Sequence, residues 1–218
     1  MNHQERLVNY INSLDSGQGP LCDRIASEAR KNHVPIIRPE TASFLKTMVA
    51  AVRPKRILEV GTAVGYSALL MAQAMPPDAH ITTIEKFEPR LLLAREHFKM
   101  AGKELSITLL EGDAGEILPQ LMSSFDFVFM DAAKGQYIHW LPSMIKLLAP
   151  GGVLLSDNVL QGGDILESRF AVERRNRTIH SRMREYLYTL KHMEELETSI
   201  IPIGDGVAVS VRRHTGTE

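Results

Sequence analysis

The chain has 218 residues, of which 44% are hydrophobic and 23% are charged, and its formal net charge is −1. This composition is typical of a globular protein and excludes a disordered chain, a collagen-like repeat and a bundle of membrane-spanning helices. The near-zero charge also excludes a broad basic surface for coating nucleic acid. The one cysteine, Cys22, excludes a disulfide framework. With no signal-peptide-like apolar run at the start, we expect a cytoplasmic protein without membrane association.

The length predicts a single domain, residues 1–218. In its first part, a helical cap at residues 1–53, apolar residues recur with helical spacing. The three predicted helices cover residues 4–14, 21–32 and 39–52. The remaining residues, 54–218, are predicted to form the core of the domain, with an arginine-rich insertion at about 160–184.

From Arg56 onward, short apolar runs alternate with amphipathic segments of helical length. The runs are ILEV, ITTIE, SITLLEGD, FDFVFMD and GGVLLSDN. This alternation predicts an α/β fold with a mostly parallel sheet. The last run, IIPIGDGVAVSVRR, is interrupted by Gly204, Asp205 and Gly206, which predicts an antiparallel hairpin at the end of the chain.

Each apolar run of the predicted parallel strands ends in a carboxylate or a glycine. Ligands of open parallel sheets bind beyond the carboxyl ends of the strands, so these side chains should line one crevice. They are Glu59, Gly61, Glu85, Gly112, Asp113, Asp131 and Asp157.

The segment Glu59–Ser67 places Gly61 and Gly65 in a strand-to-helix turn, where a backbone without Cβ atoms can approach a ligand closely. A tight connection without a ligand is the alternative. Glu85 ends the next strand, where an acidic residue accepts hydrogen bonds from ribose hydroxyls. Asp113 and Ala114 follow the third strand, in position to face an adenine ring. Together these positions predict an adenosine site without a phosphate cradle.

A second group of polar residues follows two predicted neighbouring strands. Asp131, Asp157 and Asn158 all present oxygen, and a set of hard oxygen ligands suits Mg²⁺. The alternative is that Asp157 and Asn158 only turn the chain. Lys134 follows Asp131 closely and, beside a metal, can take a proton from a hydroxyl; it is otherwise a solvated loop lysine.

Taken in order, the motifs EVGTAVGYS, GDA, DAAKGQY and DNVL, together with Glu85, resemble those of the cation-dependent O-methyltransferases of the catechol and caffeoyl-CoA type. The resemblance runs from about residue 34 to 213. It implies a Rossmann-like class I fold for S-adenosylmethionine (SAM)-dependent methyltransfer, with a seven-stranded sheet, a C-terminal antiparallel hairpin and extra N-terminal helices. It also implies homodimers. It assigns metal binding to Asp131, Asp157 and Asn158, catalysis to Lys134 with Asp131, and cofactor binding to Ser67, Glu85, Asp113, Ala114 and Asp131. Glu59 and Gly61, in the turn after the first predicted strand, are further candidates for cofactor binding.

Features outside these motifs resemble one subgroup of the family, the bacterial tRNA 5-hydroxyuridine methyltransferases, which form 5-methoxyuridine at the wobble position. They are HVPI at residues 33–36, the arginine cluster around Arg174 and IIPIGDG near the C-terminus. This resemblance implies that Ile37 also contacts the cofactor and that the partner is a tRNA anticodon loop.

The predicted substrate depends on residues 169–184, which hold six arginines and one acid, Glu173. Arginine contacts phosphates through its planar fork and stacks on bases, so Arg174, Arg175 and Arg177 are candidate RNA contacts. Alternatively, the arginines form a solvated helix face paired with Glu185, Glu194, Glu195 and Glu197. In that case the substrate is a small hydroxylated aromatic. A binding module for adenosine or NAD is a remote alternative, disfavoured by the absence of GxGxxG and the presence of the metal triplet.

Overall fold

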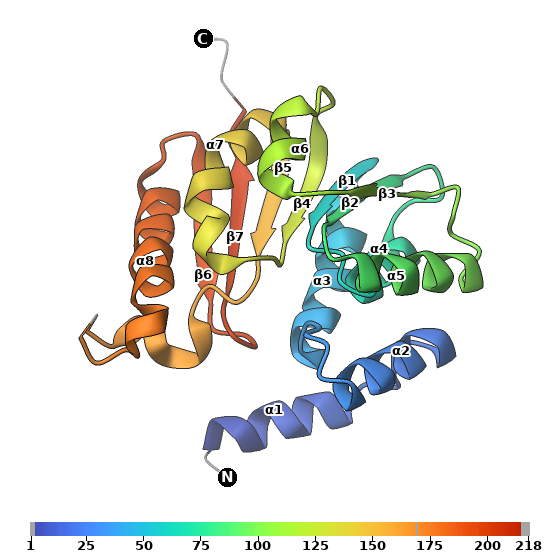
Figure 1. Ribbon diagram of the computed structural model, residues 1–218, viewed down its shortest axis with the longest axis horizontal. Coiled ribbons are helices and arrows are strands. Elements are labelled where there is room, and N and C mark those ends of the chain that lie inside the picture. The colour runs from blue at the N-terminus through green and yellow to red at the C-terminus, as the bar shows by residue number, and fades with distance from the viewer. Residues whose placement is uncertain (1–2, 169, 215–218) are drawn as a thin grey trace.

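The computed structural model describes residues 3–168 and 170–214. Its sheet has seven strands in the order β3-β2-β1-β4-β5-β7-β6 (Figure 1). The neighbours from β3 to β5 pair in parallel, whereas β7 pairs antiparallel with both β5 and β6. The strands are β1 (Arg56–Val60), β2 (His80–Glu85), β3 (Ile107–Glu111), β4 (Phe125–Met130), β5 (Leu148–Ser156), β6 (Leu196–Ile201) and β7 (Val207–Arg212). The predicted parallel sheet and C-terminal hairpin are therefore confirmed.

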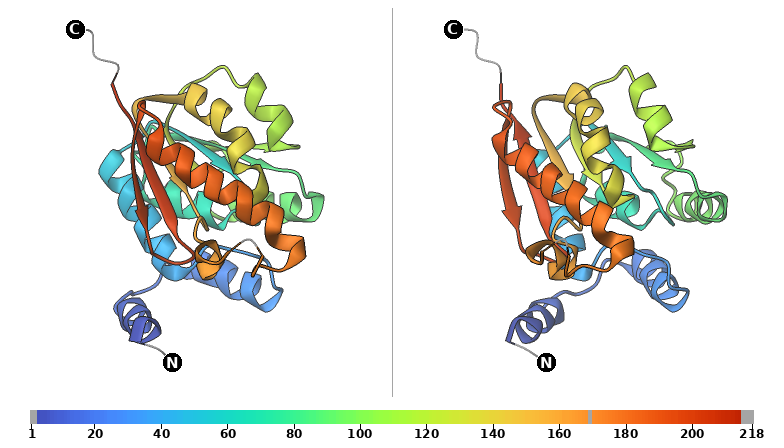
Figure 2. Two further views of the ribbon diagram at one scale, coloured as in Figure 1. Left: turned by 90° about the vertical axis from the view of Figure 1, so that its left-hand side faces the viewer. Right: turned by 60° about the vertical axis from the view of Figure 1, so that its left-hand side comes forward.

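Helices cover both faces of the sheet (Figures 1 and 2). The longer helices are α1 (His3–Ser13), α2 (Pro20–Lys31), α3 (Pro39–Val52), α4 (Tyr66–Ala74), α5 (Glu88–Met100), α7 (Tyr137–Leu147) and α8 (Arg177–His192). Short helical turns are α6 (Ala114–Ile117), η1 (Leu118–Gln120), η2 (Lys134–Gln136), η3 (Gln161–Leu166) and η4 (Arg174–Asn176). Within the described residues, no helix has the length and apolar character needed to cross a membrane.

The central strands divide their side chains between two hydrophobic layers. Phe127 and Phe129 of β4 pack with α2, α3, α4 and α5, whereas Val128 and Met130 pack with α7 and α8. Successive side chains of a strand point to opposite faces, so a strand covered on both sides becomes a continuous apolar run. This is the physical reason that β4 could be recognised in the sequence.

The first strand of the hairpin, β6, begins earlier than its apolar run in the sequence predicts. The structure begins β6 at Leu196, four residues before the apolar run IIPIGDG. Glu197 and Ser199 are exposed on this edge strand, so the first half of β6 has the alternating pattern of a half-solvated strand. The segment therefore lacks the apolar run that marked the buried strands.

Candidate active site

Asp131 and Asp157 lie side by side because their strands are neighbours. Met130 and Ser156, the last residues of β4 and β5, are register partners in a parallel pair, and each aspartate follows its strand directly. The Asp157 N–H donates to the Met130 carbonyl at 2.9 Å. The pairing thus continues past the strand ends and brings both carboxylates to one edge of the sheet, as predicted.

These two carboxylates are held in a poorly solvated place. Asp157 is 1% exposed, and burial raises the pKa of both side chains above the usual aspartate value of 3.8, with mutual repulsion adding to the shift of Asp157. Asp157 Oδ1 accepts from the Asn158 N–H at 2.8 Å. Within the described part of the chain, the Asp131 side chain makes no hydrogen bond. A buried and a half-buried carboxylate with so few donors favour a cation between them.

Tyr137, which was not singled out from the sequence, contacts the backbone at the ends of β4 and β5. Its hydroxyl accepts from the Ala132 N–H at 3.2 Å and lies 3.1 Å from the Met130 carbonyl oxygen and 3.3 Å from that of Asp157. The ring is fully buried. Tyr137 therefore joins the ends of β4 and β5, which helps to fix the separation of the two aspartates.

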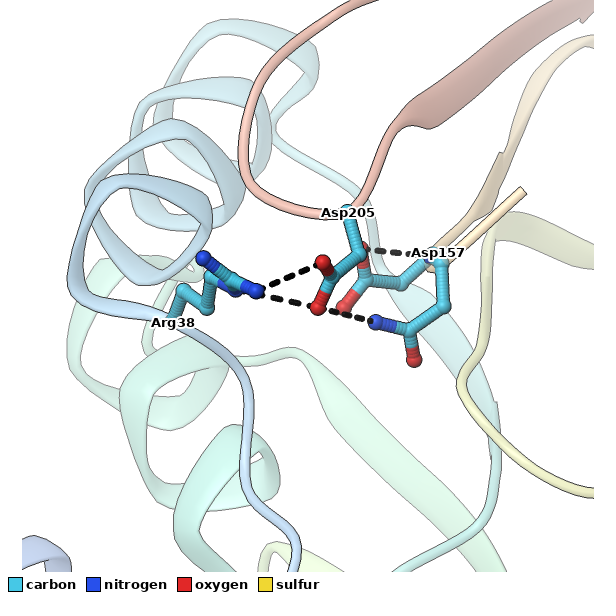
Figure 3. Close-up of polar contacts among 4 residues, drawn as sticks. Arg38, Asp157 and Asp205 are labelled. Atoms are coloured by element: carbon cyan, nitrogen blue, oxygen red, sulfur yellow. Dashed lines mark hydrogen bonds and ion pairs between the residues drawn. The ribbon is translucent and has the colours of Figure 1, made fainter. Parts of the chain in front are cut away.

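A second network, which the sequence analysis missed, joins Arg38 and Asp205 near Asp157 (Figure 3). Arg38, the residue before α3, donates to both carboxylate oxygens of Asp205, from Nε at 2.9 Å and from Nη2 at 2.7 Å. The amide nitrogen of Asn158 lies 3.4 Å from Asp205 Oδ2. Arg38 and Asp205 are 167 residues apart in the chain, so no local motif could join them.

Lys134 begins the turn η2 directly beside the carboxylates. It is half-buried, and its charge lowers the pKa of Asp131 and Asp157, opposing the larger effect of burial. Arg182 of α8 donates to the Gly135 carbonyl at 3.0 Å, which ties this turn to α8. Lys134 also lines a small pocket of about 330 Å³ together with Gln161, Gly162, Asp164, Asn176, Ile179 and Asp205. The lysine is thus available to a group that enters this pocket.

The glycine turn after β1 has the close contacts expected of it. At Gly61 (φ +105°), a Cβ atom would lie 2.1 Å from the Asp131 carbonyl oxygen, so only glycine fits between β1 and β4. Glu59, just before it, is fully buried and accepts from the hydroxyls of Ser67, at 2.5 Å, and of Thr83. Burial raises the pKa of Glu59 to about 7. Glu59 and Ser67, both predicted to bind the cofactor, are therefore hydrogen-bonded to each other.

Glu85 and Asp113, the predicted contacts of ribose and adenine, also have donors. Glu85 Oε2 accepts from Ala63 N–H, and its Oε1 accepts from Lys86 and Phe87 N–H, all at 2.9 Å. Asp113 accepts from Lys86 Nζ at 3.0 Å and from Gly115 N–H at 2.8 Å, and these contacts lower its pKa. A carboxylate has lone pairs for further donors, so both remain able to bind a nucleoside.

Two apolar residues complete the predicted cofactor site. Ile37 is 4% exposed and Ala114 is 7% exposed. Ile37 lies immediately before Arg38, and Ala114 begins α6 behind Asp113. Ile37 thus adjoins the Arg38–Asp205 network, and Ala114 lies at the β3 end of the same sheet edge.

Three of the five described arginines of residues 170–184, namely Arg177, Arg182 and Arg184, donate to backbone carbonyls. Arg177 donates to the carbonyls of Val172 and Phe170 at 3.2 and 3.1 Å, and Arg184 donates to that of Glu167 at 3.3 Å. Arg175 pairs with Glu173 at 2.7 Å and is 81% exposed. Arg174 is exposed, and Arg169 lies outside the described residues. Within those residues, none of the arginines forms an ion pair with Glu185, Glu194, Glu195 or Glu197.

A cavity of about 1480 Å³, open to solvent, adjoins the network of Arg38 and Asp205. Its walls are α1, the start of α3, the turn η3 and the loop between β6 and β7. Asp205 lines both this cavity and the smaller pocket of Lys134. Asp205, whose carboxylate lies beside Asn158, is therefore placed where two solvent-accessible spaces meet, as a site for a transferable group and an acceptor requires.

The arrangement has the parts of a group-transfer site: an edge able to bind a nucleoside, two carboxylates able to bind a cation, and a lysine near both. Comparison with known proteins identifies the chemistry. The O-methyltransferase family profile matches residues 20–213. A caffeoyl-CoA O-methyltransferase of Populus kitakamiensis is 33% identical over 175 residues, covering 78% of this chain and 74% of the relative.

A catechol O-methyltransferase of Niastella koreensis is 32% identical over 175 residues, covering 77% of this chain and 79% of the relative. The fold agrees with that of TomG from Streptomyces achromogenes, an O-methyltransferase of tomaymycin synthesis solved in complex with SAM. The TM-score is 0.86 at 26% identity, over 98% of this chain and 100% of TomG. The chain therefore belongs to the O-methyltransferase family, and it is an O-methyltransferase with the Rossmann-like fold of the SAM-dependent enzymes.

Proposed function

We propose that this enzyme transfers a methyl group from SAM to one hydroxyl of a small hydroxylated aromatic, with the help of a divalent cation, Mg²⁺ or Mn²⁺. The observation that carries the proposal is the meeting of Asp131, Asp157 and Asn158 beside Lys134 at the ends of β4 and β5. The names of the catechol and caffeoyl-CoA relatives support this class of acceptor.

The three proposed ligands fit a hard cation by their chemistry. Two carboxylates with raised pKa values and few donors lie in a buried place, and a dication would relieve both their desolvation and their repulsion. Asn158 adds a neutral amide oxygen. When bound, the cation supplies Lewis-acid polarisation and orientation of the acceptor hydroxyl.

The remaining roles belong to side chains near these ligands. Glu85, Asp113, Ala114 and Ile37 bind the adenosine part of SAM, whose sulfonium supplies the electrophilic methyl. Lys134 takes the proton that the acceptor hydroxyl loses. Arg182 holds the η2 turn through the Gly135 carbonyl at 3.0 Å, and so keeps this lysine near the acceptor.

The decisive experiment offers purified enzyme, SAM and Mg²⁺ a panel of catechol and caffeoyl compounds. We expect methylation of one hydroxyl of a vicinal pair, abolished by a chelator and restored by Mg²⁺ or Mn²⁺. Methylation that continues unchanged in the chelator would contradict the role of the cation. If no compound of the panel is methylated, the proposal of a small-molecule acceptor is contradicted.

A second candidate acceptor is 5-hydroxyuridine at the wobble position of a tRNA. Its specific support is the open cavity of about 1480 Å³, which is larger than a single aromatic ring requires, beside a segment with the exposed Arg174 and Arg175. An anticodon-loop base is already unpaired and needs little energy to enter a pocket. A 5-hydroxyl beside the O4 carbonyl also presents the adjacent oxygens of a catechol.

One competition separates the two acceptors. Undermodified tRNA from a strain lacking 5-methoxyuridine and a catechol are offered together, and methyl transfer to each is counted. Incorporation into tRNA that weakens with salt and in the double variant Arg174→Ala/Arg175→Ala supports the RNA acceptor. Incorporation into the catechol alone, unaffected by the double variant, supports the small aromatic.

A homodimer is also proposed. The support is α1 with the residue that follows it: Tyr10 and Ile11 of the helix are 63% and 57% exposed, and Leu14, just after it, is 68% exposed. The helix lies apart from the sheet (Figures 1 and 2). An exposed apolar helix face of this kind is typical of a surface that a partner subunit covers. Light scattering should give twice the mass of the chain, and Ile11→Glu should shift it toward the monomer; a wild-type monomer would contradict the proposal.

A further inference from the structure

The carboxylate of Asp205 joins the proposed metal site to the N-terminal helices. One of its sides faces the fork of Arg38, with bonds of 2.9 and 2.7 Å, and Oδ2 also faces the Asn158 amide nitrogen at 3.4 Å. The Arg38 and Asp205 side chains are 56% and 24% exposed. Figure 3 shows Asp205 between Arg38 on one side and Asp157 on the other.

The backbone of the β6–β7 loop holds Asp205 in this place. At Gly204 (φ +56°) a Cβ atom would lie 2.4 Å from Thr41 Oγ1 of α3, and at Gly206 (φ +88°) it would lie 2.3 Å from Leu160 Cγ. The Leu160 N–H donates to the Asp205 carbonyl at 2.9 Å. The loop is thus packed between α3 and the segment after β5, and this close packing requires the glycines on both sides of Asp205.

The contact with Asp205 decides which end of the Asn158 amide is free. The nitrogen of an amide donates hydrogen bonds and does not bind a hard cation, whereas its oxygen does. With Nδ2 near the Asp205 carboxylate, Oδ1 is left for the cation. Asn158 also has a left-handed backbone (φ 58°), and its N–H donates to Asp157 Oδ1 at 2.8 Å. The backbone position of Asn158 is therefore fixed, and only the orientation of its side-chain amide remains to be set.

Asp205 is separate from the ligand set itself. Among the residues that the structure describes, no three or more His, Cys, Asp or Glu side chains are grouped so as to hold a metal ion, so Asp205 does not join Asp131 and Asp157 as a third acid. Its charge raises the pKa of both. Its contact with the ligands is through Asn158.

We propose that Asp205, held by the fork of Arg38, is a positioning residue that orients the Asn158 amide with its oxygen toward the bound cation. The inference rests on the proposed metal site. It makes the start of α3, which also carries Ile37, part of the support of the metal centre. Hydrogen-bond partners of metal ligands contribute about 10–100-fold to metal affinity.

The first test measures Mn²⁺ binding to the metal-free protein by electron paramagnetic resonance, without substrate. Asp205→Ala should weaken Mn²⁺ binding about 10–100-fold, and Arg38→Ala should weaken it by a smaller factor, since Asp205 remains but is less well held. The dissociation constant for SAM should stay within about threefold in both. A matched control is the exposed pair Arg213–Glu197, 2.7 Å apart on the edge strand side; Glu197→Gln and Arg213→Ala should leave Mn²⁺ affinity unchanged.

The second test is a double-mutant cycle. If Asp205 acts through Asn158, then Asp205→Ala should add almost nothing to the loss of Mn²⁺ affinity in the Asn158→Ala background. A full additional loss there would overturn the positioning role and make Asp205 a ligand in its own right. Should Asp205→Ala fail to fold, Asp205→Asn and Arg38→Ala give the same cycle with the acidic loop less disturbed.

The outcomes separate the inference from the proposed function. A wild-type protein that does not bind Mn²⁺ would contradict the proposed metal site, and the inference with it. A wild-type protein that binds Mn²⁺, with equal affinity in Asp205→Ala and Arg38→Ala, would overturn the inference alone. Weaker binding in both variants, with unchanged controls and no further loss in the Asn158→Ala background, would support it.

Discussion

Two groups of carboxylates lie along the same edge of the sheet, and they differ in what their oxygens bond. At the ends of β1, β2 and β3, Glu59, Glu85 and Asp113 accept hydrogen bonds from hydroxyls, backbone N–H groups and a lysine. At the ends of β4 and β5, Asp131 and Asp157 have only the Asn158 N–H among the described residues.

The difference shows how one edge can serve two kinds of ligand. The first group is organised before its ligand arrives, because the protein already orients Glu85 and Asp113, and both have lone pairs left for a nucleoside; Glu59 is fully buried. The second group is left short of positive charge, which disfavours its ionised form and favours a cation. Changes at the two groups should therefore have separable effects.

The largest effect is expected from Asp157→Ala. Loss of this carboxylate removes a proposed cation ligand, so kcat should fall by at least about 10³-fold, while the SAM dissociation constant stays within about threefold. Methyl transfer from radiolabelled SAM and calorimetric titration of SAM measure the two. Full activity of the variant without added metal would break the distinction between the two groups.

Lys134→Met should be the next most damaging change. Removal of a positioned proton acceptor typically lowers kcat about 10²–10⁴-fold. The deficit should shrink at high pH, because a phenolic acceptor ionises by itself near about pH 10. A pH profile of kcat tests this, with Lys146→Met on the exposed side of α7 as the control; a deficit that is equal at every pH would argue that Lys134 is only structural.

Glu85→Ala should act on the other group. It should weaken SAM binding about 10–100-fold through loss of hydrogen bonds to a charged acceptor. It should also destabilise the fold by about 1–3 kcal/mol, because three backbone N–H groups lose their partner. Mn²⁺ affinity should be unchanged. Glu85→Gln keeps one acceptor oxygen and should give a smaller loss in both SAM affinity and thermal stability.

The smallest effect is on the stability of the metal-free enzyme. Burial raises the pKa of Asp157 in the folded state, so the folded protein binds this proton more tightly than the unfolded chain does. The corresponding stability is present at low pH and is lost as pH rises from about 4, the ordinary value, through the raised pKa. Metal-free protein should therefore melt at a lower temperature at pH 8 than at pH 5.5.

Asp157→Asn removes this titration and isolates its contribution. The variant should lose less stability than the wild type over the same pH range, by about 2–4 °C for each kcal/mol. Mg²⁺ should raise the melting temperature of the wild type at pH 8 and have little effect on the variant. Melting curves measured by scanning fluorimetry check this; equal pH dependence in both proteins would mean that Asp157 is less perturbed than its burial indicates.

The pattern of apolar residues was sufficient to predict the sheet, its hairpin and the convergence of the strand-end carboxylates. Asp131 and Asp157 could be paired because buried parallel strands appear as uninterrupted apolar runs, and each run ended at its carboxylate. Gly61 could be singled out by its position in the turn after β1. These predictions depend on local spacing and on general rules of sheet topology, both of which are written along the chain.

The contacts of long polar side chains could not be predicted from such patterns. Arg177, predicted to contact RNA, bonds the carbonyls of Val172 and Phe170, and Arg182 holds the Lys134 turn. An arginine reaches any acceptor within several ångströms, and its spacing in the chain does not say which. The local density of arginine therefore indicated a basic segment without showing how much of it is free.

The sequence by itself determined the layered α/β fold and the kinds of groups at the ends of its strands, because burial imposes a periodicity that short segments display. Only the tertiary structure decided which of those groups are already bonded and which remain short of donors. It also decided that Arg38, from the start of α3, meets Asp205 from the closing hairpin beside Asn158. A contact between segments so distant depends on how the whole chain packs, and no periodicity in either segment encodes it.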